Sequence, residues 1–252
     1  MTGPVSPVDF LAPRPDIADL AAQLARQGRV RVPQLLLPGF AESLHATMAA
    51  WRRWALVTRI EGQHRSFDAE AMAELDPARR SAFEQLVQQE AGRGFQYLFE
   101  RYPLVDHGRT GQLSDAVLLQ AFALLRSEGF LQLARQLLGA PEIRFADGQL
   151  TRYRAGHFLS LHDDEAEGLN RVAAYVINLS ADWPAADGGA LEFLSPQGDL
   201  LEAWTPGFNT MSLFRVPAPH RVSVVAPGAT GTRLSITGWF RRGAEPAVGD
   251  GP

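Results

Sequence analysis

Hydrophobic and polar positions follow a helical period in the first part of the chain. Up to about residue 144, apolar residues recur every three or four positions between charged ones. This pattern predicts helices over 16–28 and 40–56, a helical region over 68–101 interrupted at Pro77, and one or two helices over 114–139. Between the first two, residues 29–37 alternate and then turn apolar, with a proline that favours an edge strand. The N-terminal region 1–144 is therefore expected to be a helical support.

The period changes to two at about residue 145. Eight short alternating or β-branched runs follow, separated by Gly, Pro and Asp: GQLTRYR, HFLSLHD, RVAAYVINLS, GALEFLS, DLLEAW, NTMSLFRV, HRVSVVA and TRLSITGWF. Because no helix separates them, they indicate a jelly-roll-like double sheet or barrel rather than βαβ units. The fold class is thus mainly β with α, with a core over 145–242 that belongs to one domain with 1–144. Residues 243–252 are predicted to be a disordered tail.

Composition narrows the functional classes. The net charge is −4 and no basic stripe stands out, so direct nucleic-acid binding is not expected. The chain has no cysteine, which excludes disulfides, thiolate metal sites and cysteine nucleophiles. The N-terminus lacks a secretory pattern, and the longest apolar stretch, AVLLQAFALL, is too short to span a bilayer. We expect a cytoplasmic protein that does not enter membranes.

Candidate chemistry begins at the sequence HFLSLHDD. If residues 159–164 form a strand, His162 and Asp164 share one face, because side chains alternate along a strand. An imidazole and a carboxylate side by side are two of the three ligands of the facial triad that holds non-haem Fe(II). A His-x-Asp pair alone is also common by chance at exposed strand ends.

The candidate third ligand is His220. It follows the stiff turn VPAP and begins the run HRVSVV, a placement that suits a preorganised metal site. An exposed turn histidine is the alternative. The other four histidines lie in helical, loop-like or opposite-face positions and are predicted not to be ligands: His45, His64, His107 and His157.

Arg233 is the candidate anion anchor. In TRLSITGWF it shares a strand face with Ser235, Thr237 and Trp239. Burial of an arginine on an inner sheet face is costly unless an anion meets it, and a guanidinium suits a carboxylate in a bidentate grip. A salt bridge within the protein is the alternative. A His-x-Asp, a distant His and a late Arg-x-Ser in that order are improbable by chance.

The sequence resembles the Fe(II)- and 2-oxoglutarate-dependent oxygenases, and among them the prolyl hydroxylases, most of all the eukaryotic ribosomal-protein prolyl hydroxylases. The matching segments are LHDDEAEG with RVAAYVINL, DW…GGALEF, FNTMSLFRV…H and TRLSITGWF. Together they cover roughly 148–241, which corresponds to the catalytic domain alone. The N-terminal portion resembles the family only loosely.

The resemblance implies a double-stranded β-helix with Fe(II) held by His162, Asp164 and His220. The 2-oxoglutarate would chelate the iron and place its far carboxylate on Arg233. Further cosubstrate contacts would come from Ser235, Thr237 and Tyr153, although core packing also explains a tyrosine here. Where these hydroxylases carry a tyrosine that bonds the far carboxylate, this chain has Asn178, whose amide has a shorter reach.

The implied activity is that of a dioxygenase, which hydroxylates an unactivated C–H bond with O₂ and releases succinate and CO₂. Ascorbate is a candidate auxiliary reductant. The substrate implied is a prolyl residue of a protein, with ribosomal proteins as candidates. The alternatives are a small-molecule hydroxylase and a non-catalytic sensor of metal or 2-oxoglutarate. The polar stretch 57–77 is a candidate substrate lid.

Overall fold

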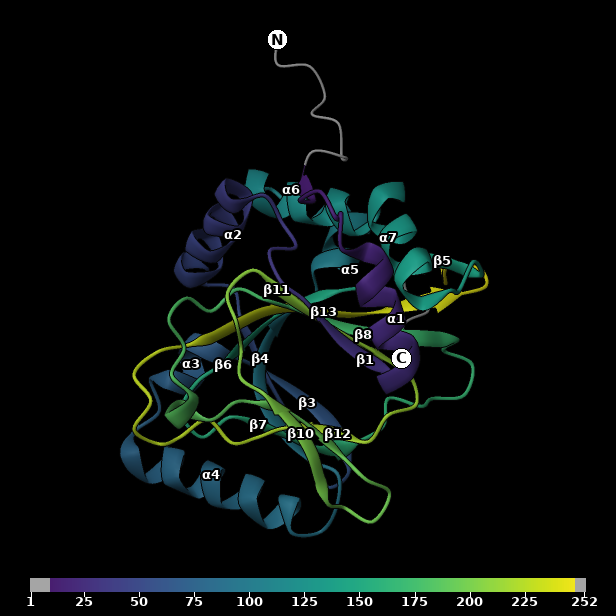
Figure 1. The fold of residues 1–252 in the computed structure, drawn as a ribbon. Coiled ribbons are helices and arrows are strands. Elements are labelled where there is room, and N and C mark those ends of the chain that lie inside the picture. The colour runs from purple at the N-terminus through teal and green to yellow at the C-terminus, as the bar shows by residue number, and fades with distance from the viewer. Residues whose placement is uncertain (1–9, 248–252) are drawn as a thin grey trace.

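A curled antiparallel sheet forms the centre of the molecule, with helices packed on its outer face (Figure 1). The structure is a computed structural model and describes residues 10–247. The helices are α1 Ile17–Gln27, α2 Pro38–Ala50, α3 Ala69–Ala73, α4 Pro77–Ala91, α5 Leu104–Arg109, α6 Ala116–Leu125 and α7 Glu128–Leu138, with a 3₁₀ turn at Ala185–Asp187. The arrangement confirms a mainly β fold with helical support.

Thirteen strands make up the sheet. The first four are β1 Arg29–Val32, β2 Ala55–Ile60, β3 Gln63–Asp68 and β4 Tyr97–Tyr102. The others are β5 Ile143–Ala146, β6 Gln149–Tyr153, β7 Phe158–His162, β8 Arg171–Asn178, β9 Leu191–Leu194, β10 Leu200–Trp204, β11 Thr210–Arg215, β12 His220–Val222 and β13 Arg233–Arg242. All eight strands predicted after residue 145 are present, and β5 is an additional one.

Two layers arise because β4 pairs with both β6 and β7. The larger layer runs β3-β2-β4-β6-β13-β8-β11-β1, and the smaller runs β7-β12-β9-β10. The edge strand β1 pairs only with β11, as the proline after it predicted. The two layers face each other across the cavity that holds the candidate site.

The helices cover the larger layer. Leucines of α1, α2, α6 and α7 form one buried cluster with apolar residues of β8 and β13. Helix ends follow their local chemistry: the Ser127 hydroxyl accepts a hydrogen bond from the backbone N–H of Phe130 at the start of α7. Gly28 and Gly139 end α1 and α7 in the left-handed conformation. The helical layer thus covers the back of the sheet.

Several predicted boundaries in the N-terminal part were wrong. The predicted helix over 40–56 ends at Ala50, and the predicted helix over 68–101 includes the strand β4. The candidate lid at 57–77 contains most of the β2–β3 hairpin, which is paired along β4. Region 1–144 therefore supplies four strands of the sheet in addition to helices, and a boundary at 144 divides a continuous sheet.

The predicted disordered tail also differs from the structure. Glu245 forms an ion pair with Arg126 at 2.7 Å, and the carbonyl of Pro246 accepts a hydrogen bond from Arg109 at 2.5 Å. Residues 243–247 are therefore docked on the protein, while 248–252 lie outside the described residues.

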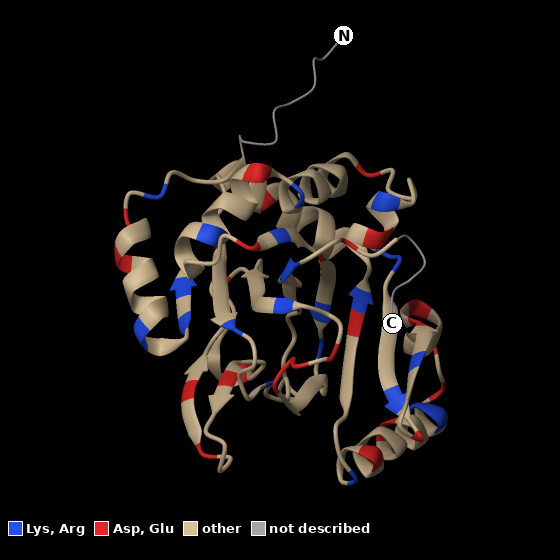
Figure 2. Cartoon of the chain, turned by 90° about the vertical axis from the view of Figure 1, so that its right-hand side faces the viewer, with Lys and Arg blue, Asp and Glu red and all other residues tan. Residues whose placement is uncertain are grey.

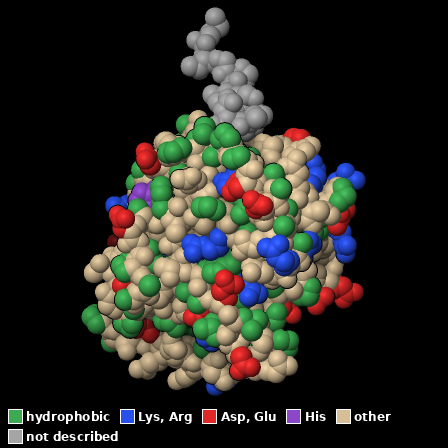
Figure 3. Space-filling model, viewed as in Figure 1, with side chains coloured by type: hydrophobic (Ala, Val, Ile, Leu, Met, Phe, Trp, Pro, Cys, Tyr) green, Lys and Arg blue, Asp and Glu red, His purple; other side chains and the backbone are tan. Residues whose placement is uncertain are grey.

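Charged and apolar side chains are mixed over the surface. Arginine and acidic residues are interspersed along the helices and strands in Figure 2, and apolar and charged side chains intermingle on the face shown in Figure 3. Within residues 10–247 no single helix is long and apolar enough to cross a membrane. One bent pair, α6 with α7, meets the length and composition criteria together, with 43° between the two helices.

Candidate active site

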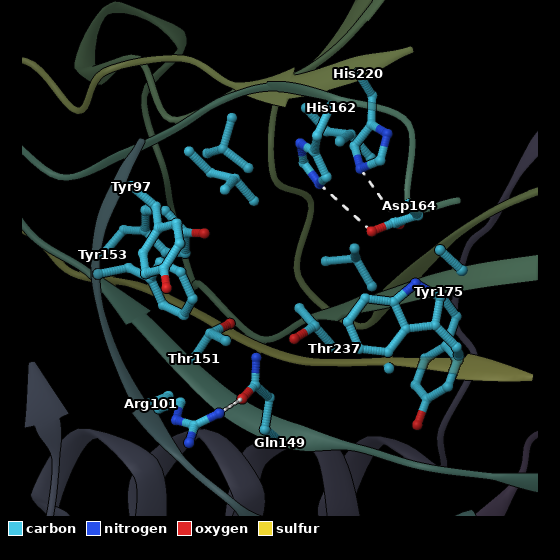
Figure 4. Close-up of a pocket in the computed structure, with 18 of the residues that line it drawn as sticks. Tyr97, Arg101, Gln149, Thr151, Tyr153, His162, Asp164, Tyr175, His220 and Thr237 are labelled. Atoms are coloured by element: carbon cyan, nitrogen blue, oxygen red, sulfur yellow. Dashed lines mark hydrogen bonds and ion pairs between the residues drawn. The ribbon is translucent and has the colours of Figure 1, made fainter. Parts of the chain in front are cut away.

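A cavity of 540 Å³ lies between the two layers of the sheet (Figure 4). Its lining combines aromatic side chains with three arginines, Arg101, Arg171 and Arg233. His162, Asp164 and His220 also line it. The two histidines, the aspartate and Arg233, which the sequence marked on distant strands, therefore share one cavity.

The two histidines and the aspartate converge at one point (Figure 4). His162 ends β7 and His220 begins β12, and these residues pair directly across the two strands. The Nε2 atom of His162 lies 3.5 Å from Oδ1 of Asp164, and Nε2 of His220 lies 3.6 Å from Oδ2. One ligand atom from each residue lies within 4.8 Å of the others, a separation that a single metal ion can bridge.

Backbone contacts fix the tautomer of both imidazoles. The Nδ1 atom of His162 lies 2.9 Å from the carbonyl oxygen of Ser160, and that of His220 lies 2.7 Å from the carbonyl of Ala218. A carbonyl oxygen can only accept, so each Nδ1 must carry the proton. Each Nε2 therefore presents a lone pair to the centre, as metal-binding histidines do.

Asp164 reaches the site in a way that strand alternation does not explain. The strand β7 ends at His162, and Asp164 adopts a left-handed conformation with φ of 65°. Arg171 supports this turn, because its Nη1 donates to the carbonyl of Asp164 at 2.9 Å and its guanidinium lies 3.7 Å from the Trp239 ring centre. The prediction that His162 and Asp164 lie together was right, but a turn after the strand brings them together.

Burial and the neighbouring side chains determine the protonation states of His220 and Asp164. Burial, followed by the neighbouring His162, lowers the pKa of His220 to about 4, so this imidazole is neutral at pH 7. Burial raises the pKa of Asp164, but the neighbouring His162 and His220 imidazoles outweigh it and hold the pKa below its ordinary value. At neutral pH the site offers a carboxylate and a neutral His220 imidazole, both of which suit a divalent metal.

Arg233 is buried in the wall of this cavity. It is 2% exposed, and its Nε has no hydrogen-bond partner among residues 10–247. Its guanidinium carbon lies 4.9 Å from the ring centre of Tyr153, and burial lowers its pKa. No carboxylate of the described chain lies within ion-pair distance of it, so the alternative of an internal salt bridge does not hold.

Tyr153 and Thr237 line the cavity as the sequence predicted. Tyr153 lies opposite Arg233 across β6 and β13 and stacks on Phe99 with ring centres 5.2 Å apart. Burial raises the pKa of its hydroxyl to about 12, so it stays protonated and can donate. Both residues therefore line the same cavity as the triad and Arg233.

Ser235 and Asn178 do not line the cavity. The Ser235 hydroxyl lies 2.8 Å from the Thr151 hydroxyl, and the Asn178 amide donates to the carbonyl of Thr210 at 3.1 Å. Tyr175 does not fill the role that Asn178 leaves open, because its hydroxyl donates to the carbonyl of Asp147 at 2.7 Å. The predicted cosubstrate contacts of Ser235 and Asn178 have no support in this geometry.

One wall of the cavity was missed from the sequence. Phe95, Tyr97 and Phe99 form a row of aromatic rings at successive distances of 5.6 Å, and Phe95 also lies 5.5 Å from the His162 ring. His64, set aside as a loop residue, lies on β3 with its Nδ1 2.6 Å from the Tyr97 hydroxyl. The alternation in YLFERY was the available signal, and it was hidden within a run that also fits a helix.

Comparison with known protein families gives a match over the residues that form much of the cavity. Residues 148–241, which contain the triad and Arg233, match the model of the 2OG-Fe(II) oxygenase superfamily. The chain carries a 2OG-Fe(II) oxygenase domain. Such a domain is that of a dioxygenase that uses Fe(II), 2-oxoglutarate and O₂, and the His-Asp-His group fits iron binding.

Two curated relatives of the oxygenase domain are prolyl hydroxylases. The chain is 29% identical over 120 residues to Prolyl 3-hydroxylase OGFOD1 of Xenopus laevis. It is 33% identical over 129 residues to Prolyl 3,4-dihydroxylase OGFOD1 of Ostreococcus tauri. The matches cover 45% and 46% of this chain but only 23% and 24% of those proteins.

Solved structures share the fold of the oxygenase domain. A Pseudomonas putida prolyl-4-hydroxylase superposes with a TM-score of 0.57 at 19% identity, over 90% of this chain and 100% of its own. A Trichoplax adhaerens prolyl hydroxylase, in complex with a fragment of hypoxia inducible factor, gives 0.60 at 14% identity, over 90% and 89%. These similarities confirm the jelly-roll fold.

Proposed function

We propose that the chain hydroxylates a prolyl residue of a protein at an unactivated C–H bond, with Fe(II) and 2-oxoglutarate. The observation that carries the proposal is a single cavity that contains both a His-Asp-His centre and a buried arginine with no carboxylate partner among residues 10–247. The centre suits the metal, and the arginine suits the far carboxylate of the cosubstrate.

The donor set fits Fe(II). Two imidazole nitrogens and one carboxylate occupy one face of the centre and come from β7, the following turn and β12. The opposite side opens onto the cavity rather than onto packed core. We assign the ligands as His162, Asp164 and His220.

The surroundings of Arg233 fit a carboxylate. A fully buried guanidinium without an anion is expensive, and a bound carboxylate would satisfy its donors in a dry setting. The protonated Tyr153 hydroxyl and the Thr237 hydroxyl line the same cavity and are placed to donate to the bound cosubstrate. We assign Arg233 as its anchor.

Bound iron and 2-oxoglutarate supply an oxidation in which O₂ converts 2-oxoglutarate to succinate and CO₂ and a substrate C–H to C–OH. The chain's own residues position the reactants. Arg233 orients the cosubstrate along the cavity, and Arg171 holds the turn that carries Asp164. Apolar side chains of Leu191 and Phe214 exclude water from the same space.

The preference for proline rests on two supports. The two curated relatives carry the names of prolyl hydroxylases. The cavity also has the aromatic wall of Phe95, Tyr97 and Phe99 beside the triad. A pyrrolidine ring is apolar and flat enough to pack on such a wall, so this surface would orient the ring over the metal.

The test uses purified protein reconstituted anaerobically with Fe(II) and 2-oxoglutarate, then exposed to O₂ with ribosomal and cytosolic protein fractions. Peptide mass spectrometry should find one added oxygen on a defined proline, absent with His162→Ala. Succinate formation from a panel of free amino acids, with no modified peptide, would contradict the protein substrate and indicate a small-molecule hydroxylase. If no succinate forms under any condition, the proposal that the chain is a 2-oxoglutarate-dependent enzyme is contradicted.

A further inference from the structure

One of the three arginines of the cavity has no assigned partner. Arg171 donates a hydrogen bond to the carbonyl of Asp164 and packs on the Trp239 ring. Arg233 is the proposed anchor of 2-oxoglutarate. Arg101 lines the same cavity, yet within residues 10–247 it has no carboxylate in ion-pair distance and only a 3.5 Å contact from Nη1 to Oε1 of Gln149. The cavity therefore holds one more cation than the cosubstrate requires.

Arg101 is fixed in place by its strand. It lies on β4, where its Cα pairs with Thr151 of β6 on one side and with Ala55 of β2 on the other. Its side chain leaves the same strand face as Tyr97 and Phe99, toward the cavity. A half-buried guanidinium on the middle of three paired strands is preorganised, so it loses little entropy when it binds a ligand.

Gln149 lies beside Arg101 on the neighbouring strand. A guanidinium only donates hydrogen bonds, so the amide oxygen of Gln149 must face Arg101 and its NH₂ must face the other way. In Figure 4 this nitrogen points away from Arg101 toward the space beside Thr151 and Thr237. Both hydrogens of that nitrogen remain without a partner among the hydrogen bonds of residues 10–247.

We propose that Arg101, with Gln149 beside it, holds a carboxylate of the substrate, separate from the 2-oxoglutarate carboxylate on Arg233. The guanidinium supplies the charge and its remaining N–H donors, while the Gln149 carboxamide oxygen lies against Nη1. Thr151 and Thr237 lie between this pair and the triad (Figure 4), so the anchored group sits apart from the C–H bond that reacts. This inference rests on the proposed function and specifies its substrate as an acid.

Two sources supply such a carboxylate in a prolyl substrate. One is an aspartate or glutamate side chain near the target proline, and the other is a main-chain carboxylate, as in a C-terminal or free proline. The recognition chemistry is the same for both. The experiment must therefore separate them.

The test measures binding, so that it does not depend on turnover. Protein loaded with Mn(II) and 2-oxoglutarate without O₂ is applied to an array of proline-containing peptides. Matched peptides carry Asp or Asn, and Glu or Gln, at each position near the proline, and others end in proline as the acid or the amide. Retention on Asp or Glu peptides identifies a side-chain acid, and retention on the C-terminal acid alone identifies a main-chain carboxylate.

Arg101→Gln should weaken this retention about 10- to 100-fold, the usual effect of losing a charge-assisted contact. Affinity for 2-oxoglutarate should not change, because Arg233 holds it. Arg144→Gln is the matched control, since Arg144 is exposed on β5 and outside the cavity. Equal retention of acid and amide peptides, no retention of any peptide, or an unchanged Arg101→Gln would overturn the inference. Succinate formation that persists in those cases would leave the proposed function standing.

Discussion

Replacement of Arg233 by methionine should stabilise the ligand-free protein while it weakens 2-oxoglutarate binding. Of the two buried arginines among residues 10–247, Arg233 is the one without a carboxylate partner, and methionine replaces its aliphatic stem with a flexible apolar chain that carries no charge. Replacing a buried charge with an apolar side chain of similar volume commonly stabilises by about 1–4 kcal/mol. The lost cation–π contact with Tyr153 opposes this by about 0.5–2 kcal/mol.

The net expectation is about 1 kcal/mol of added stability, or a Tm about 2–4 °C higher for a chain of this size. The KM for 2-oxoglutarate should rise about 10- to 100-fold, because a charge-assisted contact contributes about 1.5–3 kcal/mol. Calorimetry of the metal-free protein measures the first quantity, and succinate formation measures the second.

Arg152 supplies the matched control. It is buried to a similar degree but is paired with Glu100. Arg152→Met removes one of the two ion pairs of the buried Glu100 carboxylate and leaves only that with Arg154 at 3.2 Å, so it should lose about 1.5–3 kcal/mol of stability. The two variants should thus change Tm in opposite directions. A destabilised Arg233→Met with an unchanged KM would refute the anchor role and indicate a structural one.

Three further predictions follow from the local structure. Arg171→Met should weaken Mn(II) binding about 10- to 100-fold in a metal titration, because Arg171 holds the turn of the ligand Asp164; unchanged affinity would show that the turn holds itself. Burial lowers the pKa of His157 to about 4, so the unfolded chain binds a proton that the folded chain does not as pH falls from about 6.5 to 4. Stability should drop by about 3 kcal/mol over that window, and His157→Asn should remove this part of the drop in urea titrations at several pH values. Gly188→Ala should lose about 3 kcal/mol or more, because its φ is 68° and a Cβ would lie 2.2 Å from a backbone oxygen, whereas Gly228→Ala should be nearly neutral, with nothing within 4 Å of the added carbon.

Local pattern was sufficient for the strands of the core. Each of the eight runs after residue 145 carries its own alternation and turn residues, so each was visible without knowledge of its neighbours. The strand β4 could not be recognised in this way. Tyr97–Tyr102 follows a long polar helix and becomes a strand through pairing with β2, β6 and β7. Pairing with distant strands decided the structure of β4, and a short stretch of sequence does not show such pairing.

In the candidate site, too, some residues could be predicted from the sequence and others could not. His162 and His220 lie where the strands predicted, and Arg233 could be recognised because a buried inner-face arginine needs an anion. The left-handed turn at Asp164 could not be predicted, since it depends on Arg171 and the loop around it. Asn178 was expected at the cosubstrate, but a neighbouring carbonyl takes its amide instead.

The most direct test of the central claim is metal-dependent succinate formation by the wild-type chain and by Asp164→Ala, with Fe(II) binding measured on the same samples. The account predicts that the wild type binds one Fe(II) and releases succinate from 2-oxoglutarate in O₂. Asp164→Ala should lose both while its ligand-free Tm stays close to that of the wild type. Succinate formation that survives in a folded Asp164→Ala would contradict the metal centre proposed here.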